Sequence, residues 1–470
     1  MSTFPPPDFG LQLSPRVHVC DGGRTLMGGG RVVRLSAPAA RLVRHLPAPV
    51  GDDPAAARLA RLLLGRGLAD PWWPEPARAD EAVDDVTVVV PTHDRAEVVA
   101  RLLASLPSSV PVIVVDDGSR DPAALERVCG EHDALLLRHE QNQGPAAARN
   151  TGLRAVRTTY VAFCDSDVVP QPGWLATLRR HLDDPAVTLV GPRVLGRAAT
   201  PGDAWLERYE QARSSLDLGD RPALVALHGA VSYLPSAALV ARVDALEDGF
   251  DEAMRCGEDV DLVWRLLADG WSVRYEPAAV VRHDHRTTLR AWLGRKAFYG
   301  TSAAPLSARH PGAVAPMVVS PWTAAVTLAL LVQRRWSVPL LGGAVSLATA
   351  SAARRLGASD RPVRAAAVIV LEGSVAAAWQ TASALTRHYW PLVAVASVGS
   401  RRARRAALVA GVVEGVLDWR RTRPELDLPR YVIAHRLDDL AYGAGLWLGA
   451  LRTGSLRALA PRLVGWRSSS

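Results

Sequence analysis

Three apolar runs between residues 86 and 164 constrain the fold of this chain most strongly, because two of them end directly in carboxylates. The runs are 86–90, 112–115 and 160–164, the second followed by Asp116 and Asp117 and the third by Asp165 and Asp167. Continuous β-branched runs are typical of strands buried on both faces of a parallel sheet. Residues 96–106 carry a helical pattern, so the first two runs form a βαβ unit. Ligands of such sheets bind beyond the carboxyl ends of the strands, where these carboxylates lie.

The chemistry around these strand ends favours a phosphate-bearing ligand. No Gly-x-Gly-x-x-Gly string follows the first run, which argues against a nicotinamide or flavin site. Residues 141–150 are predicted to open a helix, and Arg149 can donate a fork of hydrogen bonds to phosphate oxygens. Asp165 and Asp167 can hold a hard divalent cation that shares its shell with substrate phosphates. The alternative is that these strings are only turns, which Asp and Gly favour for backbone reasons.

The order and spacing of the strings resemble the family 2 glycosyltransferases of the GT-A fold. The strings are Pro91-Thr92-His93-Asp94, Asp116-Asp117-Gly118-Ser119, residues 142–150, Asp165-Ser166-Asp167, and a downstream stretch from Gly249 through Glu258, Asp259 and Gly270 to His283. The resemblance covers less than half of the chain. It implies an α/β GT-A core, preceded by a small winged-helix-like domain and followed by an α-helical, apolar C-terminal region.

The resemblance also implies a donor site and a metal site. The residues that would surround the UDP-sugar are Pro91, Thr92, Asp94, Asp116, Asp117, Arg149 and Asp165. Among them, Asp117 would contact the nucleotide base and Arg149 would approach the uridine diphosphate. Asp165 and Asp167 would bind Mn²⁺ or Mg²⁺, and His283 would complete the metal shell, since an imidazole is a common ligand. His285 is the weaker histidine candidate.

A pair of acids further along the chain would supply the catalytic base. Glu258 and Asp259 precede a predicted helix, and the family places its base in this pair. Asp259 would take the proton of the acceptor hydroxyl while that oxygen attacks the anomeric carbon. One such displacement inverts the configuration of the sugar. The alternative is that both acids merely cap the helix, where negative charge is favoured.

Composition bears on where the protein acts. The four cysteines are isolated, which fits a reducing, cytosolic setting, and the N-terminus has no pattern of a cleavable signal peptide. The formal charge of +8 is spread over the chain. Its densest basic cluster, 401–405, follows an apolar stretch, which suits an anionic membrane surface better than a nucleic acid. We expect a cytoplasmic protein associated with the inner face of the membrane, with no nucleic-acid partner.

Residue composition and the pattern of predicted strands and helices divide the chain into three regions, 1–80, 86–305 and 311–470. In the first, residues 16–20 and 31–35 read as strands, and residues 38–45 and 54–66 read as helices. This order suggests a winged-helix-like module that recognises a peptide, the alternative being a packing domain that caps the enzyme. The second region carries the catalytic motifs.

The third region is predicted to be helical and membrane-associated. Residues 311–333 and 336–353 contain no charged side chain, and each run approaches the ~20 apolar residues that span a bilayer. A second apolar pair lies within 364–400. We expect a hairpin in or on the membrane, the alternative being an Ala-rich soluble bundle. No Gln-x-x-Arg-Trp string follows Asp259 before Tyr299, which argues against a processive channel-forming synthase.

The overall plan resembles the glycosyltransferases of the mycofactocin system of actinobacteria. Short strings near Leu26–Gly29 and Gly67–Pro71 also resemble the peptide-recognition domains of enzymes that mature ribosomal peptides. The resemblance implies a UDP-glucose donor, a peptide-derived redox cofactor precursor as acceptor, and a β-1,4-linked glucose chain as product. Two alternatives remain. One is a rhamnosyl-, galactosyl- or glucosyltransferase that builds cell-wall glycan or glycolipid on a lipid-linked acceptor, and the other is an inactive nucleotide-binding partner subunit.

Overall fold

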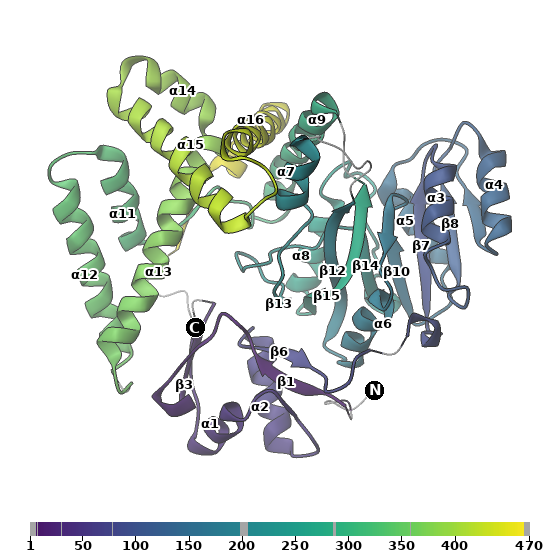
Figure 1. Cartoon of the computed structure of the whole chain (residues 1–470), viewed down its shortest axis with the longest axis horizontal. Coiled ribbons are helices and arrows are strands. Elements are labelled where there is room, and N and C mark those ends of the chain that lie inside the picture. The colour runs from purple at the N-terminus through teal and green to yellow at the C-terminus, as the bar shows by residue number, and fades with distance from the viewer. Residues whose placement is uncertain are drawn as a thin grey trace.

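The computed structural model of the chain describes residues 6, 8–29, 31–77, 79–197, 205–284, 288–357 and 359–464. It has a central α/β core, a small N-terminal unit beneath it and a helical C-terminal region beside it (Figure 1). The N-terminal unit touches both of the other parts. Arg61 pairs with Asp184 of the core at 2.6 Å, and Asp21 accepts hydrogen bonds from Ser359 and from the backbone of Asp360.

A mixed sheet in the order β11-β15-β12-β14-β10-β7-β8-β9 forms the core, with β13 paired to β15. Its strands are β7 (Val86–Thr92), β8 (Val112–Asp116), β9 (Leu135–Arg138), β10 (Tyr160–Cys164), β11 (Val168–Pro170), β12 (Val187–Arg197), β13 (Ala223–Leu224), β14 (Ala238–Arg242) and β15 (Ser272–Asp284). β10, β7, β8 and β9 run parallel, and β14 is antiparallel to β10. The carboxyl ends of β7, β8 and β10 therefore meet at one edge of the sheet.

Both faces of this sheet are covered, as the three apolar runs predict. All seven residues of β7 are buried, and they divide between two apolar clusters. The helices on one face are α3 (Ala96–Leu103), α4 (Pro122–Glu131) and α6 (Trp174–Arg179), and those on the other are α5 (Pro145–Ala155) and α8 (Glu258–Ala268). The helix expected over 96–106 ends at Leu103. All four cysteines are free.

The N-terminal unit contains two small sheets and two helices. The sheets have the orders β5-β1-β6 and β2-β3-β4. The elements are β1 (Gly10–Leu13), β2 (His18–Cys20), β3 (Thr25–Gly28), β4 (Arg31–Arg34), α1 (Ala37–Arg44), β5 (Ala48–Pro49), α2 (Pro54–Gly65) and β6 (Ala69–Trp72). Side chains of Ser36 and Asp53 cap the two helices, which explains why both helix starts were predictable. Four of the six strands, β1, β3, β5 and β6, were not predicted.

Helices make up most of the remaining chain. They are α7 (Trp205–Arg213), α9 (Leu289–Thr301), α10 (Ala303–Arg309), α11 (Pro321–Val332), α12 (Ser337–Arg355), α13 (Pro362–Ser383), the π-helical turn η5 (Ala384–His388), α14 (Trp390–Gly399), α15 (Arg401–Thr422) and α16 (Leu428–Thr453). α16 lies against α9 of the core (Figure 1). Glycines permit this close approach, because a Cβ on Gly445 would lie 1.8 Å from the carbonyl oxygen of Ala297.

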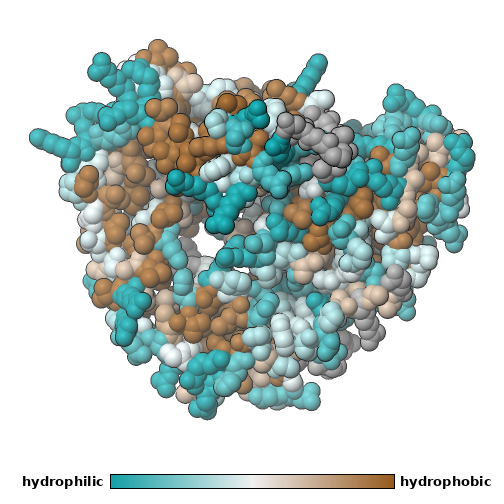
Figure 2. All heavy atoms as spheres, viewed as in Figure 1, coloured by the Kyte–Doolittle hydropathy of each residue, from teal (hydrophilic) through white to brown (hydrophobic). Residues whose placement is uncertain are grey.

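The C-terminal helices α11 to α16 carry exposed apolar side chains. Val338 is 77% exposed, Leu371 is 65% exposed and Val395 is 74% exposed, and Figure 2 shows apolar atoms gathered on this side of the molecule. Within the described residues, one helix, Pro362–His388, is long and apolar enough to cross a membrane. This helix overlaps the second apolar pair, 364–400, and not 311–333 or 336–353, and the hairpin in or on the membrane stays a prediction. α11 begins only at Pro321 and has 12 residues, and α12 ends in two arginines.

Candidate active site

A cavity of about 850 Å³ opens at the edge where β7, β8 and β10 end. Its "sheet end" is lined by the last residues of β7, Pro91 and Thr92, and by residues that follow β8 and β10, including Asp117. Its "helix end" is lined by residues of α9, η5 and α16, including Tyr299 and Tyr442. The predicted carboxylates Asp165, Asp167 and Asp259 line the same cavity.

The two acids after β8 have separate surroundings. The carboxylate of Asp117 accepts hydrogen bonds from the backbone N–H groups of Gln143 and Gly144, both at 2.8 Å, and contacts Nδ1 of His139 at 2.8 Å. Asp117 therefore fixes the loop that opens α5, while it also lines the cavity. Asp116 is fully buried against Ser119 and Arg138 and is not part of the cavity lining.

The loop after β7 supplies cavity residues other than the expected Asp94. Asp94 has a left-handed backbone with φ of 54°, and its carboxylate accepts hydrogen bonds from the backbone and side chain of Arg120, both at 2.7 Å. His93 and Arg95 line the cavity in its place. Oγ1 of Thr92 is buried and has no hydrogen-bond partner among the described residues. A ligand at the sheet end can supply that partner.

Arg149 joins the two acidic motifs across the cavity. It donates to Oδ1 of Asp165 at 2.6 Å and to Oε1 of Glu258 at 3.0 Å, and its guanidinium lies over the ring of Phe250. The side chain is 3% exposed, so these two carboxylates compensate the charge that burial would otherwise penalise. Burial raises the pKa of Asp165 despite the charge of Arg149. Arg149 thus sets the spacing between Asp165 and Glu258.

Asp167 and His283 meet because β11 and β15 pair in register. Val168 lies opposite His283 in this antiparallel pair, which brings Nε2 of His283 within 3.3 Å of Oδ1 of Asp167. Arg95 donates to the other oxygen, Oδ2, at 2.5 Å. Burial favours the neutral acid, but His283 and Arg95 outweigh it and lower the pKa of Asp167.

Asp167 and His283 fit a divalent cation whose coordination shell also includes atoms of the substrate. A carboxylate oxygen and an imidazole nitrogen are suitable donors for Mn²⁺ or Mg²⁺. No group of three or more His, Cys, Asp or Glu side chains gathers to hold a metal within the described ranges. Phosphate oxygens and water would therefore have to complete the coordination. His285 lies outside the described residues.

The hydrogen bonds and the pKa of Asp259 fit a carboxylate that acts as a general base. Asp259 lies in the first turn of α8, which follows Gly257 with a φ of 81°. Oδ1 accepts from the backbone of Val260 at 2.8 Å, and Oδ2 accepts from the backbone of Ser236 at 3.0 Å. The second contact reaches another segment, so Asp259 does more than cap its own helix. Burial and the neighbouring charge of Glu258 raise the pKa of Asp259 to about 6, which leaves the carboxylate ionised at neutral pH.

Sequence reasoning missed most of the remaining cavity wall. The missed residues include Arg95, Tyr233, Ser236, Arg255, Arg295, Tyr299, Arg387, His388 and Tyr442. Arg95 could have been found, because it continues the string Pro-Thr-His-Asp after β7. The others come from segments far apart in the chain and belong to no short motif.

A mixed sheet of this order, with Asp165 and Asp167 at the exit of β10 and an acidic pair opening α8, defines a glycosyltransferase of the GT-A fold. The model "Glycosyl transferase family 2" matches residues 87–249. The chain is 46% identical to the "Pre-mycofactocin glycosyltransferase" of Mycobacterium tuberculosis, over 97% of this chain and 98% of that one. It therefore belongs to the family 2 glycosyltransferases.

Two further similarities cover the core. "Succinoglycan biosynthesis protein ExoU" of Rhizobium meliloti is 28% identical over 48% of this chain and 70% of its own length. Among solved structures, the mannosyltransferase PcManGT of Pyrobaculum calidifontis, in complex with GDP-Man and Mn²⁺, is 22% identical. That match covers 66% of this chain and 90% of the solved chain, with a TM-score of 0.38.

Proposed function

We propose that this glycosyltransferase transfers glucose from UDP-glucose to a peptide-derived redox cofactor precursor of the mycofactocin system, with inversion, and extends a β-1,4-linked glucose chain. The position of Asp259 carries the mechanistic part of the proposal, because it faces the cavity beside the Arg149 bridge to Asp165. The acceptor assignment is supported by the mycobacterial relative, which aligns over nearly the whole of both chains.

In this proposal the donor occupies the sheet end of the cavity. The nucleoside lies against Pro91, Thr92 and Asp117, and the buried Oγ1 of Thr92 gains a hydrogen-bond partner. The diphosphate lies near Asp165 and Asp167. A divalent cation held by Asp167 and His283 would supply positive charge to the departing diphosphate. Asp94 and Asp116 have no direct role in binding, because neither lines the cavity.

Asp259 performs the proton transfer. Its ionised carboxylate accepts the proton of the acceptor hydroxyl as that oxygen forms a bond to the anomeric carbon. The bond between that carbon and the UDP oxygen breaks, and UDP leaves with the electron pair. Attack from the face opposite the leaving group converts an α-linked donor into a β-glycoside. Glu258 acts through Arg149, whose position it fixes.

The two flanking regions receive supporting roles. We assign the unit at 1–80 to recognition of the peptide-derived part of the acceptor. We assign the region at 311–470 to association with the inner face of the cell membrane, a role supported by the exposed apolar side chains of α12 to α14. The arginines at the start of α15 suit an anionic lipid surface.

The test incubates the purified full chain with UDP-glucose, other UDP-hexoses and GDP-mannose, with Mn²⁺ or Mg²⁺, and follows release of the nucleotide. The expected result is release from UDP-glucose that is stimulated by the mycofactocin precursor and abolished by a chelator. Stimulation only by a lipid-linked acceptor would favour the cell-wall or glycolipid alternative. Absence of turnover with every donor and acceptor would favour the inactive partner subunit.

A further inference from the structure

The helix end of the cavity has a wall that is built by the C-terminal region and not by the family 2 core alone. Arg387 and His388 of η5 and Tyr442 and Leu446 of α16 line the same cavity as Asp259. They face Tyr299 of α9, which lies on the core side. The helix end therefore closes only when α16 is packed against α9.

Three tyrosines, Tyr233, Tyr299 and Tyr442, line this end of the cavity that also contains Asp259. Burial raises the pKa of Tyr233, and the negative charge of Asp259 raises it further. Burial likewise raises the pKa of Tyr299 to about 12, and Asp259 adds to that shift. Asp259 and the three phenol groups therefore belong to one chamber.

Two of the phenol groups are available to a ligand. Tyr233 donates its hydroxyl to the carbonyl oxygen of Ser215 at 3.3 Å. The hydroxyls of Tyr299 and Tyr442 have no hydrogen-bond partner among the described residues, although both side chains line the cavity. Both side chains are half-buried, and a tyrosine hydroxyl can both donate and accept a hydrogen bond. An occupant of the chamber can supply the partner.

Buried ion pairs hold this wall in place. Lys296 of α9 is 2% exposed, and its Nζ lies 3.0 Å from Glu210 and 3.0 Å from Asp438 of α16. Arg387 lies 3.4 Å from Asp439, and its guanidinium stacks over the ring of Tyr442 at 3.8 Å. A buried charge that loses its partner is costly, so these ion pairs favour one arrangement of the elements that they join.

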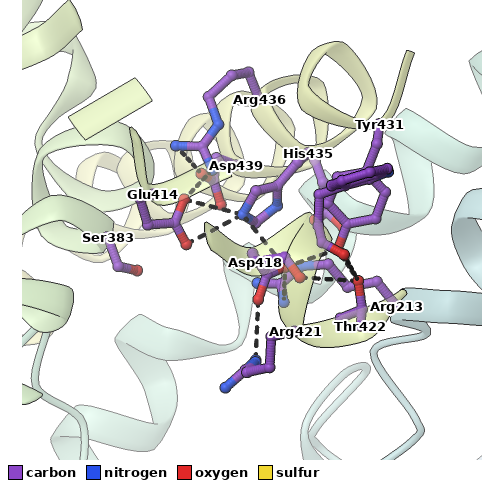
Figure 3. A network of polar contacts seen from close by, with 12 residues as sticks. Arg213, Ser383, Glu414, Asp418, Arg421, Thr422, Tyr431, His435, Arg436 and Asp439 are labelled. Carbon is purple, nitrogen blue, oxygen red and sulfur yellow. Dashed lines mark hydrogen bonds and ion pairs between the residues drawn. The ribbon is translucent and has the colours of Figure 1, made fainter. Parts of the chain in front are cut away.

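The network continues behind the wall and ties α15 and α16 to the core. Figure 3 shows Asp418 in contact with both Tyr431 and Arg213. The Tyr431 hydroxyl donates to Oδ2 of Asp418 at 2.7 Å, and Nη1 of Arg213 lies 2.8 Å from the same oxygen. Glu414 and His435 pair nearby at 3.1 Å. Because Arg213 belongs to α7 of the core, the wall is fixed from both sides.

The chemistry of the chamber suits a hydroxylated ring. Two of its cations, Lys296 and Arg387, are already paired with carboxylates, while Arg255 and Arg295 also line the cavity. Tyr299 and Tyr442 each contribute an aromatic ring and a hydroxyl group, and Arg387 covers one face of the Tyr442 ring. A sugar ring matches both features, since it presents an apolar C–H face and a rim of hydroxyls.

We infer that η5 and α16 complete an acceptor subsite, in which Tyr299 and Tyr442 bind the terminal glucosyl unit of a β-linked gluco-oligosaccharide and direct its hydroxyl towards Asp259. This inference rests on the proposed function for the identity of the sugar. It makes Tyr442, which lies outside the family 2 motifs, a binding residue for the growing chain.

The test measures binding of cellotriose to the full chain by a ligand-observed NMR titration without donor, in parallel with UDP-glucose hydrolysis. Wild type is expected to bind cellotriose. Tyr442→Ala and Tyr299→Ala are each expected to bind it at least tenfold more weakly. Tyr442→Phe, which keeps the ring, should show an intermediate loss and the melting temperature of wild type. Leu451→Ala, at a 72% exposed position of α16, is the matched control and should bind normally.

The outcomes separate this inference from the proposed function. Failure of wild type to bind cellotriose, or unchanged binding by the folded Tyr442 variants, would overturn the subsite even if UDP-glucose is hydrolysed. Binding of cellotriose that depends on Tyr442, without any use of UDP-glucose, would leave the subsite standing and refute the proposed donor.

Discussion

The two ends of the catalytic cavity are built in opposite ways. The sheet end takes its residues from the last positions of β7 and from the segments that follow β7, β8 and β10, so its position is set by the strands themselves. The helix end combines Tyr233, Tyr299, Arg387 and Tyr442, which are separated by long stretches of chain and meet only through helix packing. The difference teaches that the sheet end of the cavity can be predicted from short motifs, whereas the helix end depends on tertiary structure.

Asp259 is the proposed base, and it lies between the sheet end and the helix end of the cavity. Replacing it in Asp259→Asn should therefore have the largest effect on kcat. The amide keeps the size of the side chain but cannot take the acceptor proton, so kcat should fall by about 10²–10⁴-fold. Donor affinity should be unchanged. The melting temperature should fall only slightly, because the amide nitrogen cannot accept one of the two backbone hydrogen bonds whereas burial disfavours the charge that is removed. Release of UDP in a coupled assay measures kcat. Asp269→Asn, at the exposed far end of α8, is the control, and equal activity in both variants would remove Asp259 from the mechanism.

At the sheet end, Asp167→Asn should lower kcat by roughly 10²-fold, since it removes charge from the side chain that faces His283. The variant should require more Mn²⁺ or Mg²⁺ for half-maximal activity. A metal titration of UDP release tests this expectation. Full activity of wild type in the presence of a chelator would contradict the prediction that the use of the donor at the sheet end depends on a metal ion.

The raised pKa of Asp259 predicts the pH dependence. The pKa of about 6 lies above the usual 3.8, so the carboxylate is ionised above about pH 6 and becomes protonated below it. A base must be ionised to act, so kcat/KM should level off above pH 6 and fall about tenfold per unit well below it. A pH profile of transfer at saturating metal measures this. Activity that rises as pH falls through 6 would contradict the assignment.

At the helix end, Tyr442→Phe should have the smallest effect. Loss of one hydroxyl contact, at roughly 0.5–1.5 kcal/mol, should raise the acceptor KM by roughly 2–12-fold. The donor KM and the release of UDP without acceptor should stay at the wild-type values. Initial rates at varied acceptor concentration measure the change. An increase in the donor KM alone would place Tyr442 at the wrong end of the cavity.

The strand-derived part of the fold was predictable because burial on two faces leaves a continuous apolar run in the sequence. The runs at 112–115 and 160–164 correspond to β8 and β10, and the carboxylates Asp165 and Asp167 lie at the expected strand exit. Side-chain direction was not predictable. Asp94 turns towards Arg120 because its backbone has a positive φ, and Asp116 is buried between Ser119 and Arg138.

The helical, apolar character of the C-terminal region was predictable, but apolar composition does not distinguish a membrane surface from a packing surface. α13 exposes Leu371, whereas α16 buries Asp438 and Asp439. The carboxylates on α16 pair with cations from α9 and η5, which no local pattern reveals. Position in the assembled fold, and not hydropathy, separates the two helices.

The most direct test of the division between the two ends is a crossed pair of kinetic measurements on Thr92→Val and Tyr442→Ala. Donor KM and acceptor KM are determined for both variants in one transfer assay. Thr92→Val, which removes the unpartnered Oγ1 at the sheet end, should raise only the donor KM, and Tyr442→Ala should raise only the acceptor KM. Equal increases of both constants in either variant would contradict separate donor and acceptor ends.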